Sequence, residues 1–191
     1  MSLCSSNKTK DKTPIQSLKK LKLNNSEDID LIESISCIVE DTIKRNASLK
    51  KHPKKSIFFC EEPIIPVSIY TYILNIYSFL NLEFSTIILS LININRLLER
   101  RRDHLSKNNF YKLFITSCLL NSKINEDITY DSDCFAMAGN IDKNELIFLE
   151  KKFFEMVDYR LFVNDEVYRR YFTFIKNKVI KTNISLESKQ E

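Results

Sequence analysis

The sequence predicts an all-α protein, a single bundle of five helices, called the box below, with one additional helix on each side. Two observations come from composition. The 191 residues include one glycine and four prolines, whereas hairpins and tight loops depend on glycine for positive φ or close backbone approach. The 43% hydrophobic and 28% charged shares are those of an ordinary globular protein. The third is that apolar residues recur at helical spacing along most of the chain. The length suits one domain with extensions.

The first two segments differ sharply in pattern. Residues 1–25 are rich in Lys and Ser with little apolar periodicity, which favours a disordered basic arm. Residues 26–66 are expected to hold an N-terminal helix, at about 27–45, and a polar linker containing Phe58 and Phe59, one of which should anchor it. Ser26 followed by two acids is a plausible helix start. The helix is supported by the apolar series Ile29, Ile32, Ile35, Val39 and Ile43.

Residues 67–163 are expected to form the box. Its first helix starts after Ser68, a suitable cap. A wide apolar stripe follows, made of Ile69, Tyr72, Ile73, Ile76, Tyr77 and Leu80. The second helix runs from Phe84 to Leu98, and the basic residues Arg100 to Arg102 suit the negative end of its dipole.

The third helix of the box starts after Ser106 and runs through an apolar stretch to Lys123. Because five helices follow one another within about 90 residues, one should be surrounded by the others, and this helix is the best candidate. A short helix near 131–138 follows. Its end is predicted at Gly139, acting as the C′ residue.

The fifth helix of the box and a further helix complete the chain. Asp142 is the expected cap of the fifth helix, with Glu145 at the spacing of a capping box. Its buried seam is predicted to be Leu146, Leu149, Phe153 and Val157. Residues 164–191 are expected to form a C-terminal helix, from Asp165 to about Lys181, and a polar tail.

Several classes of protein are excluded or disfavoured by composition. With Gly139 as the only glycine, no dinucleotide-binding, Walker or nucleophile-elbow motif can be written. The five cysteines contain no C-x-x-C and there are two histidines, which disfavours a zinc site and indicates reduced thiols in the nucleus or cytoplasm. No apolar run reaches the roughly 20 residues of a membrane span. We therefore expect no metal, no small-molecule cofactor and no membrane residence.

The net charge of +4 is unevenly distributed. Residues 1–56 hold 12 Lys/Arg against 7 Asp/Glu, and residues 57–191 hold 17 against 18. A basic tail can contact nucleic acid or serve as a nuclear address, but such runs are more often solvated tails. Because no recognised nucleic-acid-binding pattern accompanies the charge, specific nucleic-acid binding is not expected.

Four stretches of the chain carry a more specific pattern. In chain order they are "PVSIYTYILNIYSFL", "STIILSLININRLLER", "NNFYKLFITSCLLNSKINEDITYDSDCFAMAGNI" and "ELIFLEKKFFEMVDYRLFV". In order and spacing they resemble the cyclin box of the P/U-type, phosphate-regulation-like cyclins. The preceding "LIESISCIVEDTIKRN" and its "FF…P" linker resemble that group's N-terminal helix. The resemblance covers roughly residues 29–175.

The resemblance implies a non-catalytic regulatory subunit that forms a heterodimer with a cyclin-dependent Ser/Thr protein kinase and activates it by positioning the kinase C-helix. In cyclins generally, a Lys at the end of the third box helix and a Glu in the fifth hydrogen-bond the kinase backbone, and Lys123 and Glu150 occupy those places. The chemistry is suitable, because an ammonium donates to carbonyls and a carboxylate accepts from N–H groups. The family's apolar contacts would fall on Ile124, Phe154 and Tyr159.

Each of these residues also has an ordinary structural interpretation. Lys123 can simply place a cation at a helix C-terminus, worth typically 0.3–1 kcal/mol. Glu150 can be a solvated helix position. The other three can be core residues. Their joint spacing, rather than any one of them, favours the binding interpretation.

The sequence departs from the family pattern in two places. Many cyclins pair a buried Arg of the first box helix with the Asp of an I-D-R segment, but here the segment is Ile94-Asn95-Arg96 and no Arg lies between Ser68 and Leu80. We expect Asn95 to be hydrogen-bonded instead, and a first-helix docking motif for substrates is in doubt. The family's double glycine is Gly139-Asn140 here, and Asn tolerates positive φ well enough to keep the turn.

Two other functions stay open at this point. A cyclin-box adaptor in transcription would bind its partner without activating a kinase, although a general-transcription-factor relative would need a second box and a zinc ribbon. An enzyme has weak support: Glu126 and Asp127 are adjacent carboxylates, but such pairs after a helix are usually caps or turn residues, and no His is near in sequence.

Overall fold

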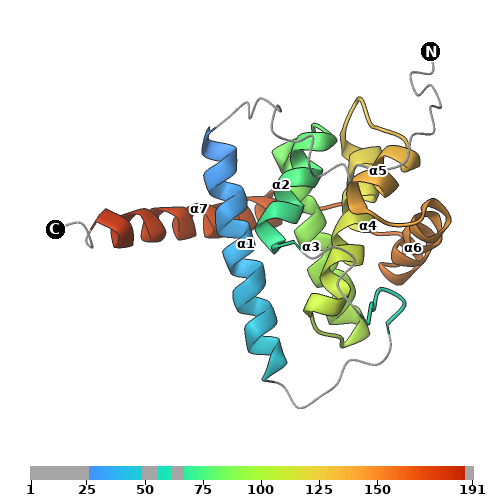
Figure 1. Cartoon of the computed structure of the whole chain (residues 1–191), viewed down its shortest axis with the longest axis horizontal. Helices are drawn as coiled ribbons and strands as arrows, with labels where there is room; N and C mark the ends of the chain where they lie inside the picture. The colour runs from blue at the N-terminus through green and yellow to red at the C-terminus, as the bar shows by residue number, and fades with distance from the viewer. Residues whose placement is uncertain (1–25, 49–55, 62–66, 188–191) are drawn as a thin grey trace.

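The computed structural model describes residues 26–48, 56–61 and 67–187, the last eight of these by their backbone alone, and this part of the chain contains helices and no strand (Figure 1). The helices are α1 (Ser26–Ala47), α2 (Ile69–Phe79), α3 (Phe84–Arg101), α4 (Lys107–Asn125), α5 (Ser132–Gly139), α6 (Lys143–Met156) and α7 (Asp165–Glu187). The predicted fold class is confirmed: α2 to α6 are the five helices of the box, with α1 and α7 added. The helix expected to end near Lys181 continues to Glu187. The predicted arm, residues 1–25, lies outside the described residues.

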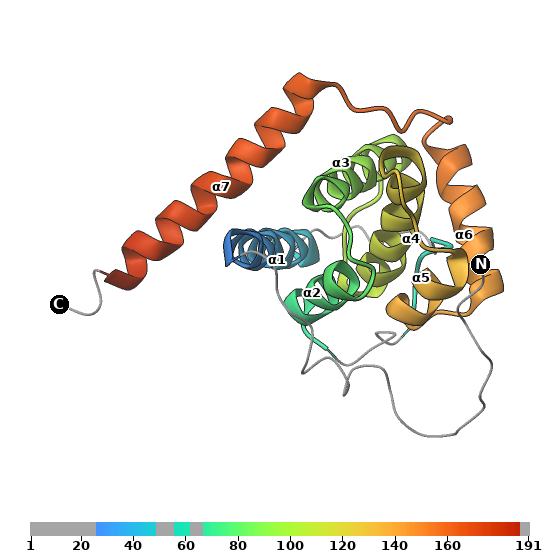
Figure 2. The same cartoon turned by 90° about the horizontal axis from the view of Figure 1, so that it is seen from above.

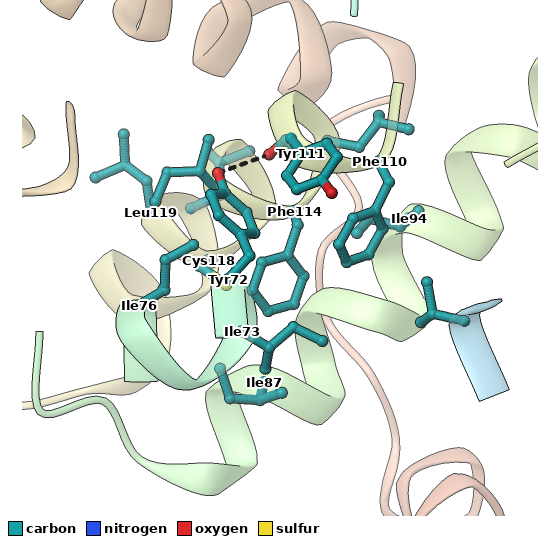
Figure 3. Packing of buried hydrophobic residues seen from close by; sticks show 14 of the residues in the cluster. Tyr72, Ile73, Ile76, Ile87, Ile94, Phe110, Tyr111, Phe114, Cys118 and Leu119 are labelled. Atoms are coloured by element: carbon teal, nitrogen blue, oxygen red, sulfur yellow. Dashed lines mark hydrogen bonds between the residues drawn. The ribbon is translucent and has the colours of Figure 1, made fainter. Parts of the chain in front are cut away.

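Helix α4 is the centre of the bundle, as predicted. It packs against α3, α5 and α6, and every residue from Leu113 to Ser122 is buried. An aromatic cluster joins it to α2: the ring of Tyr72 lies edge-on to that of Tyr111, with centroids 4.8 Å apart, and near Phe110 and Phe114 (Figure 3). The Tyr72 hydroxyl donates to the Tyr111 carbonyl at 3.1 Å. The last turn of α4 therefore belongs to a helix that is buried along most of its length.

The two outer helices lie on the side of the bundle away from α6 (Figures 1 and 2). Helix α1 packs on α2 and on α7 through the predicted apolar positions Ile32, Ile35, Val39 and Ile43, all buried. Tyr77 of α2 donates its hydroxyl to Asp28 of α1 at 2.7 Å. Burial, and then this hydrogen bond, raises the pKa of Tyr77, so the hydroxyl keeps the proton that it donates at physiological pH.

Local signals place the helix starts where the sequence predicts them. The Ser68 side chain accepts from the N–H of Thr71 at 3.1 Å, and Asp142 accepts from the N–H groups of Asn144 and Glu145. Such caps satisfy N–H groups that a helix leaves without partners. In the linker before the box, Phe58 is the buried anchor, and its ring meets that of Phe153 edge-on.

Glu126 is a structural residue, in agreement with the turn interpretation of the two adjacent acids. One of its carboxylate oxygens accepts from the backbone N–H of Glu83 at 3.1 Å and from the hydroxyl of Thr86 at 2.5 Å. The other accepts from Ser122 at 3.3 Å. The carboxylate thus caps the N-terminus of α3 from the loop after α4, which ties two neighbouring helices together.

The turn after α5 corrects one prediction. Asn140, rather than Gly139, has the left-handed conformation at the helix end, with φ 50° and ψ 47°, as the tolerance of Asn for positive φ allows. Gly139 lies inside the helix without a positive φ. Its role is close packing, because a Cβ there would lie 2.6 Å from Cγ1 of Ile115 in α4.

Gly139→Ala is therefore expected to lower the free energy of unfolding by about 1–2 kcal/mol. Alanine has a better helix propensity by roughly 1 kcal/mol, but overpacking a tight core costs about 1–3 kcal/mol, and Ile115 is fully buried. Urea unfolding followed by circular dichroism measures the change. In an Ile115→Ala background the same substitution should be neutral or stabilising, and an equal loss in both backgrounds would contradict the close-contact explanation.

Candidate functional site

The structure brings Lys123 and Glu150 into direct contact. Lys123 lies in the last turn of α4 and Glu150 in α6, and the ammonium Nζ donates to the carboxylate Oε1 at 2.6 Å. The lysine side chain is 38% exposed and the glutamate side chain 17% exposed. A lysine has three donors and a carboxylate about four acceptor positions, so both groups retain hydrogen-bonding capacity toward solvent.

The fold gains little from this ion pair. Partly exposed pairs of this kind contribute about 0–1 kcal/mol. A second pair, between Lys112 and Glu145, joins the same two helices, and here the lysine side chain is 13% exposed. Burial lowers the pKa of Lys112, but the hydrogen bond to Glu145 and nearby charges raise it more, so the net shift is upward. The two links differ in which partner is exposed: the lysine in Lys123–Glu150, and the carboxylate, 39% exposed, in Lys112–Glu145.

Two predicted aromatic residues lie together at the end of α6. The rings of Phe154 and Tyr159 meet edge-on with centroids 4.9 Å apart. Phe154 is half-buried, whereas Tyr159 is 64% exposed. Asp158 and Tyr159 both have left-handed backbones, with φ of 59° and 58°, which is uncommon for residues other than glycine. This turn presents the tyrosine ring to solvent instead of burying it.

A buried polar network fixes the segment that follows Tyr159. Asn93 of α3 donates from Nδ2 to the Asn121 carboxamide at 2.9 Å and to the Leu161 carbonyl at 3.2 Å. Arg96 donates to the Phe162 carbonyl at 2.8 Å. Asn93 and Asn121 are both almost fully buried. The connection from α6 to α7 is thus held to the centre of the bundle by side chains of α3.

Asn95 forms a neutral hydrogen bond instead of an ion pair. Asn95 donates its amide to the hydroxyl of Tyr171 in α7 at 3.1 Å, which confirms that it is hydrogen-bonded. The contact joins the box to a helix outside it. Asn95 therefore has a structural role, which is to join α3 to α7.

Most of the exposed apolar residues lie in the part of the chain that follows Lys123. Of the ten large apolar residues that are exposed in the described parts of the chain, eight lie between residues 124 and 162. They are Ile124, Ile128, Tyr130, Met137, Ile147, Phe148, Tyr159 and Phe162. Ile124, at 54% exposure, directly follows Lys123. Exposed apolar side chains next to a charged pair are typical of an interaction site.

Sequence reasoning missed part of this surface. Ile147 lies three residues before Glu150 and seven before Phe154, so the three share one side of α6. The available signal was the run from Leu146 to Leu149, four consecutive apolar residues of which Leu146 and Leu149 alone are buried. An amphipathic helix buries one face, so the other two residues of the run, Ile147 and Phe148, are left in solvent.

Other chemistries have little support in the described residues. Across the described ranges no three His, Cys, Asp or Glu side chains come together in a way that could hold a metal ion. Cys118 is buried in α4, and burial raises the pKa of its thiol to about 12, so it is not a nucleophile at neutral pH. Among the helices described, none combines the length and apolar character that crossing a membrane requires.

Comparisons with known proteins show which proteins the chain is similar to. The family model named Cyclin matches residues 5–161. Cyclin-U2-1 and Cyclin-U2-2 of Arabidopsis thaliana are each 26% identical to the chain, over 154 and 165 residues, which cover 78% and 82% of this chain and 69% and 71% of those proteins. Cyclin-P3-1 of Oryza sativa subsp. japonica is 24% identical over 153 residues, 78% of this chain and 65% of its own length.

Proposed function

The chain belongs to the cyclin family, as a cyclin-box protein of the P/U type, and from this premise we propose that it is the regulatory subunit of a cyclin-dependent Ser/Thr protein kinase. In this proposal the chain binds the kinase beside its C-helix and activates it. It supplies binding energy and no catalytic group. Lys123, Glu150, Ile124, Phe154 and Tyr159 form its kinase-binding surface.

The observation that supports the proposal is the Lys123–Glu150 pair, whose lysine is 38% exposed, with exposed apolar side chains beside it. The pair joins α4 to α6 at 2.6 Å, and Ile124 and Tyr159 beside it are more than half exposed. Charged groups that can bond a main chain, next to aromatic and aliphatic anchors, are the usual anatomy of an interface hot spot. Ile147 extends the same surface along α6.

The mechanism is a shift of the kinase population. An isolated kinase spends most of its time with the C-helix away from the position that completes its Lys–Glu pair. A subunit that binds the active arrangement more tightly moves the equilibrium toward it. Changing a 1:99 population to 99:1 requires a preference of about 5.5 kcal/mol. An interface of standard size, ~1,200–2,000 Å², can supply that difference.

Reconstitution with purified components tests the proposal. Cyclin-dependent kinases of the source organism are purified singly and mixed with the full chain, and phosphorylation of a Ser-Pro peptide is measured against chain concentration. We expect at least one kinase to form a 1:1 complex and its activity to rise saturably, by up to about 100-fold. Stable binding without a gain in activity would instead indicate the adaptor function.

A further inference from the structure

A cavity of about 390 Å³ lies where α1, α3, α7 and the start of α4 meet. Figure 2 shows α1 and α7 on the side of the bundle away from α6. Its inner wall is apolar and belongs to the core, with Ile35, Val39, Ile94 and Phe110 all at least 96% buried. Ligand pockets typically enclose about 300–1,000 Å³, so this cavity is large enough for a small molecule. None of the residues assigned to kinase binding lines it.

The outer edge of the cavity is positively charged. Arg45 of α1 and Arg170 of α7, both exposed, contribute to its lining from two different helices. Arg45 donates to the Asp41 carbonyl and the Thr42 hydroxyl of its own helix. Among the described residues Arg170 has one polar contact, a long ion pair with Glu166 at 3.9 Å. Since a guanidinium has five N–H donors, each arginine retains donors that can bind an anion.

A neighbouring hollow continues this edge and adds further basic residues to it. It shares Arg45 with the cavity and adds Lys44, Lys178 and Asp41. Asp41 lies 3.4 Å from Lys178, so the one acid is already opposed by a base. The charged groups that line the two hollows are thus four bases and one acid, which is complementary to an anionic group next to an apolar body.

We propose that this cavity binds a small amphipathic carboxylate, with its apolar part against the inner wall and its carboxylate between Arg45 and Arg170. A guanidinium matches a carboxylate in a bidentate geometry, and the aliphatic wall removes the apolar part from water. The ligand contacts both α1 and α7, so its binding stabilises the packing of α7 against the box. This site does not include the proposed kinase-binding residues, and its test does not depend on whether the chain binds a kinase.

Decanoate is a suitable probe, titrated below its micelle concentration into the purified full chain by calorimetry and by NMR. We expect saturable 1:1 binding, and binding of decanol, which lacks the charge, that is about tenfold weaker or more, because charge-assisted hydrogen bonds are lost. Arg170→Ala and Arg45→Ala should each weaken decanoate binding by about tenfold. Leu91→Phe, which fills part of the cavity from α3, should remove binding while helix content is retained.

Arg169→Ala is the matched control. Arg169 precedes Arg170 in α7, has a similar long ion pair of 3.9 Å with the acid four residues earlier, and does not line the cavity. Its substitution should leave decanoate affinity unchanged. Equal losses for Arg169→Ala and Arg170→Ala, binding that survives Leu91→Phe, or no saturable binding would each overturn the proposal. So would a finding that an acidic peptide with one phenylalanine binds there while decanoate does not.

Discussion

Exchanging the two charges, Lys123→Glu together with Glu150→Lys, is expected to abolish kinase binding while leaving the helical fold intact. The exchange keeps an ion pair between α4 and α6, so the free energy of unfolding should change by less than about 1 kcal/mol. The partner, however, now meets a carboxylate where its carbonyls require a donor. Reversing buried interfacial charges costs at least the 2–5 kcal/mol that truncation costs, or about 30-fold to several thousand-fold in affinity.

The measurement uses the kinase identified by reconstitution, with affinity from biolayer interferometry and stability from thermal unfolding. The matched control exchanges Lys112 and Glu145, a pair of the same residue types between the same two helices. Because Lys112 is more buried, that exchange is the harsher test of the fold, yet it should leave kinase affinity nearly unchanged. Unchanged affinity after the Lys123/Glu150 exchange would show that the binding surface lies elsewhere.

Asn93→Leu is expected to lower the free energy of unfolding by about 2–5 kcal/mol. Leucine fills a similar volume but leaves the Asn121 carboxamide oxygen and the Leu161 carbonyl without the donor that Asn93 supplies to both. Each buried group that loses its partner costs about 1–3 kcal/mol. Urea unfolding, followed by circular dichroism, measures the loss.

Asn95→Leu supplies the comparison for this prediction. Asn95 lies two residues along the same helix, is half-buried, and donates one hydrogen bond to a tyrosine hydroxyl. Its substitution should cost about 1 kcal/mol or less. A loss for Asn93→Leu no greater than that for Asn95→Leu would contradict the view that this buried network holds the segment after α6.

Local sequence signals predicted most of the fold. Ser68 and Asp142 cap helices by hydrogen bonds to their own first turns, and α4 is buried as its apolar residues indicated. These features depend on residues within a few positions of one another, so they are visible in the sequence. The assignment of Gly139 as a cap was wrong. A glycine stands there because a side chain would collide with Ile115, which is 24 positions away in the chain.

Long-range polar contacts could not be predicted for the same reason. Glu126 caps a helix that begins about 40 residues earlier, and Asn93 bonds a carbonyl 68 residues later. For the candidate site, family resemblance pointed to Lys123 and Glu150, and the structure adds that they bond each other. Their part in kinase binding stays a prediction. The apolar run that holds Ile147 is visible in the sequence, but periodicity alone does not show that its outward residues join the surface around Lys123.

The burial of α4 has a consequence for the energetics of complex formation. Binding residues are commonly drawn from segments that open easily, whereas Lys123 belongs to a helix whose side chains from Leu113 to Ser122 are all buried. Detaching that helix exposes most of the core, so local opening near Lys123 approaches global unfolding. A partner that binds only the folded end of α4 therefore stabilises the whole bundle against unfolding, by an amount that rises with the logarithm of its concentration relative to Kd. The lifetime of this chain would then rise and fall with the supply of its partner.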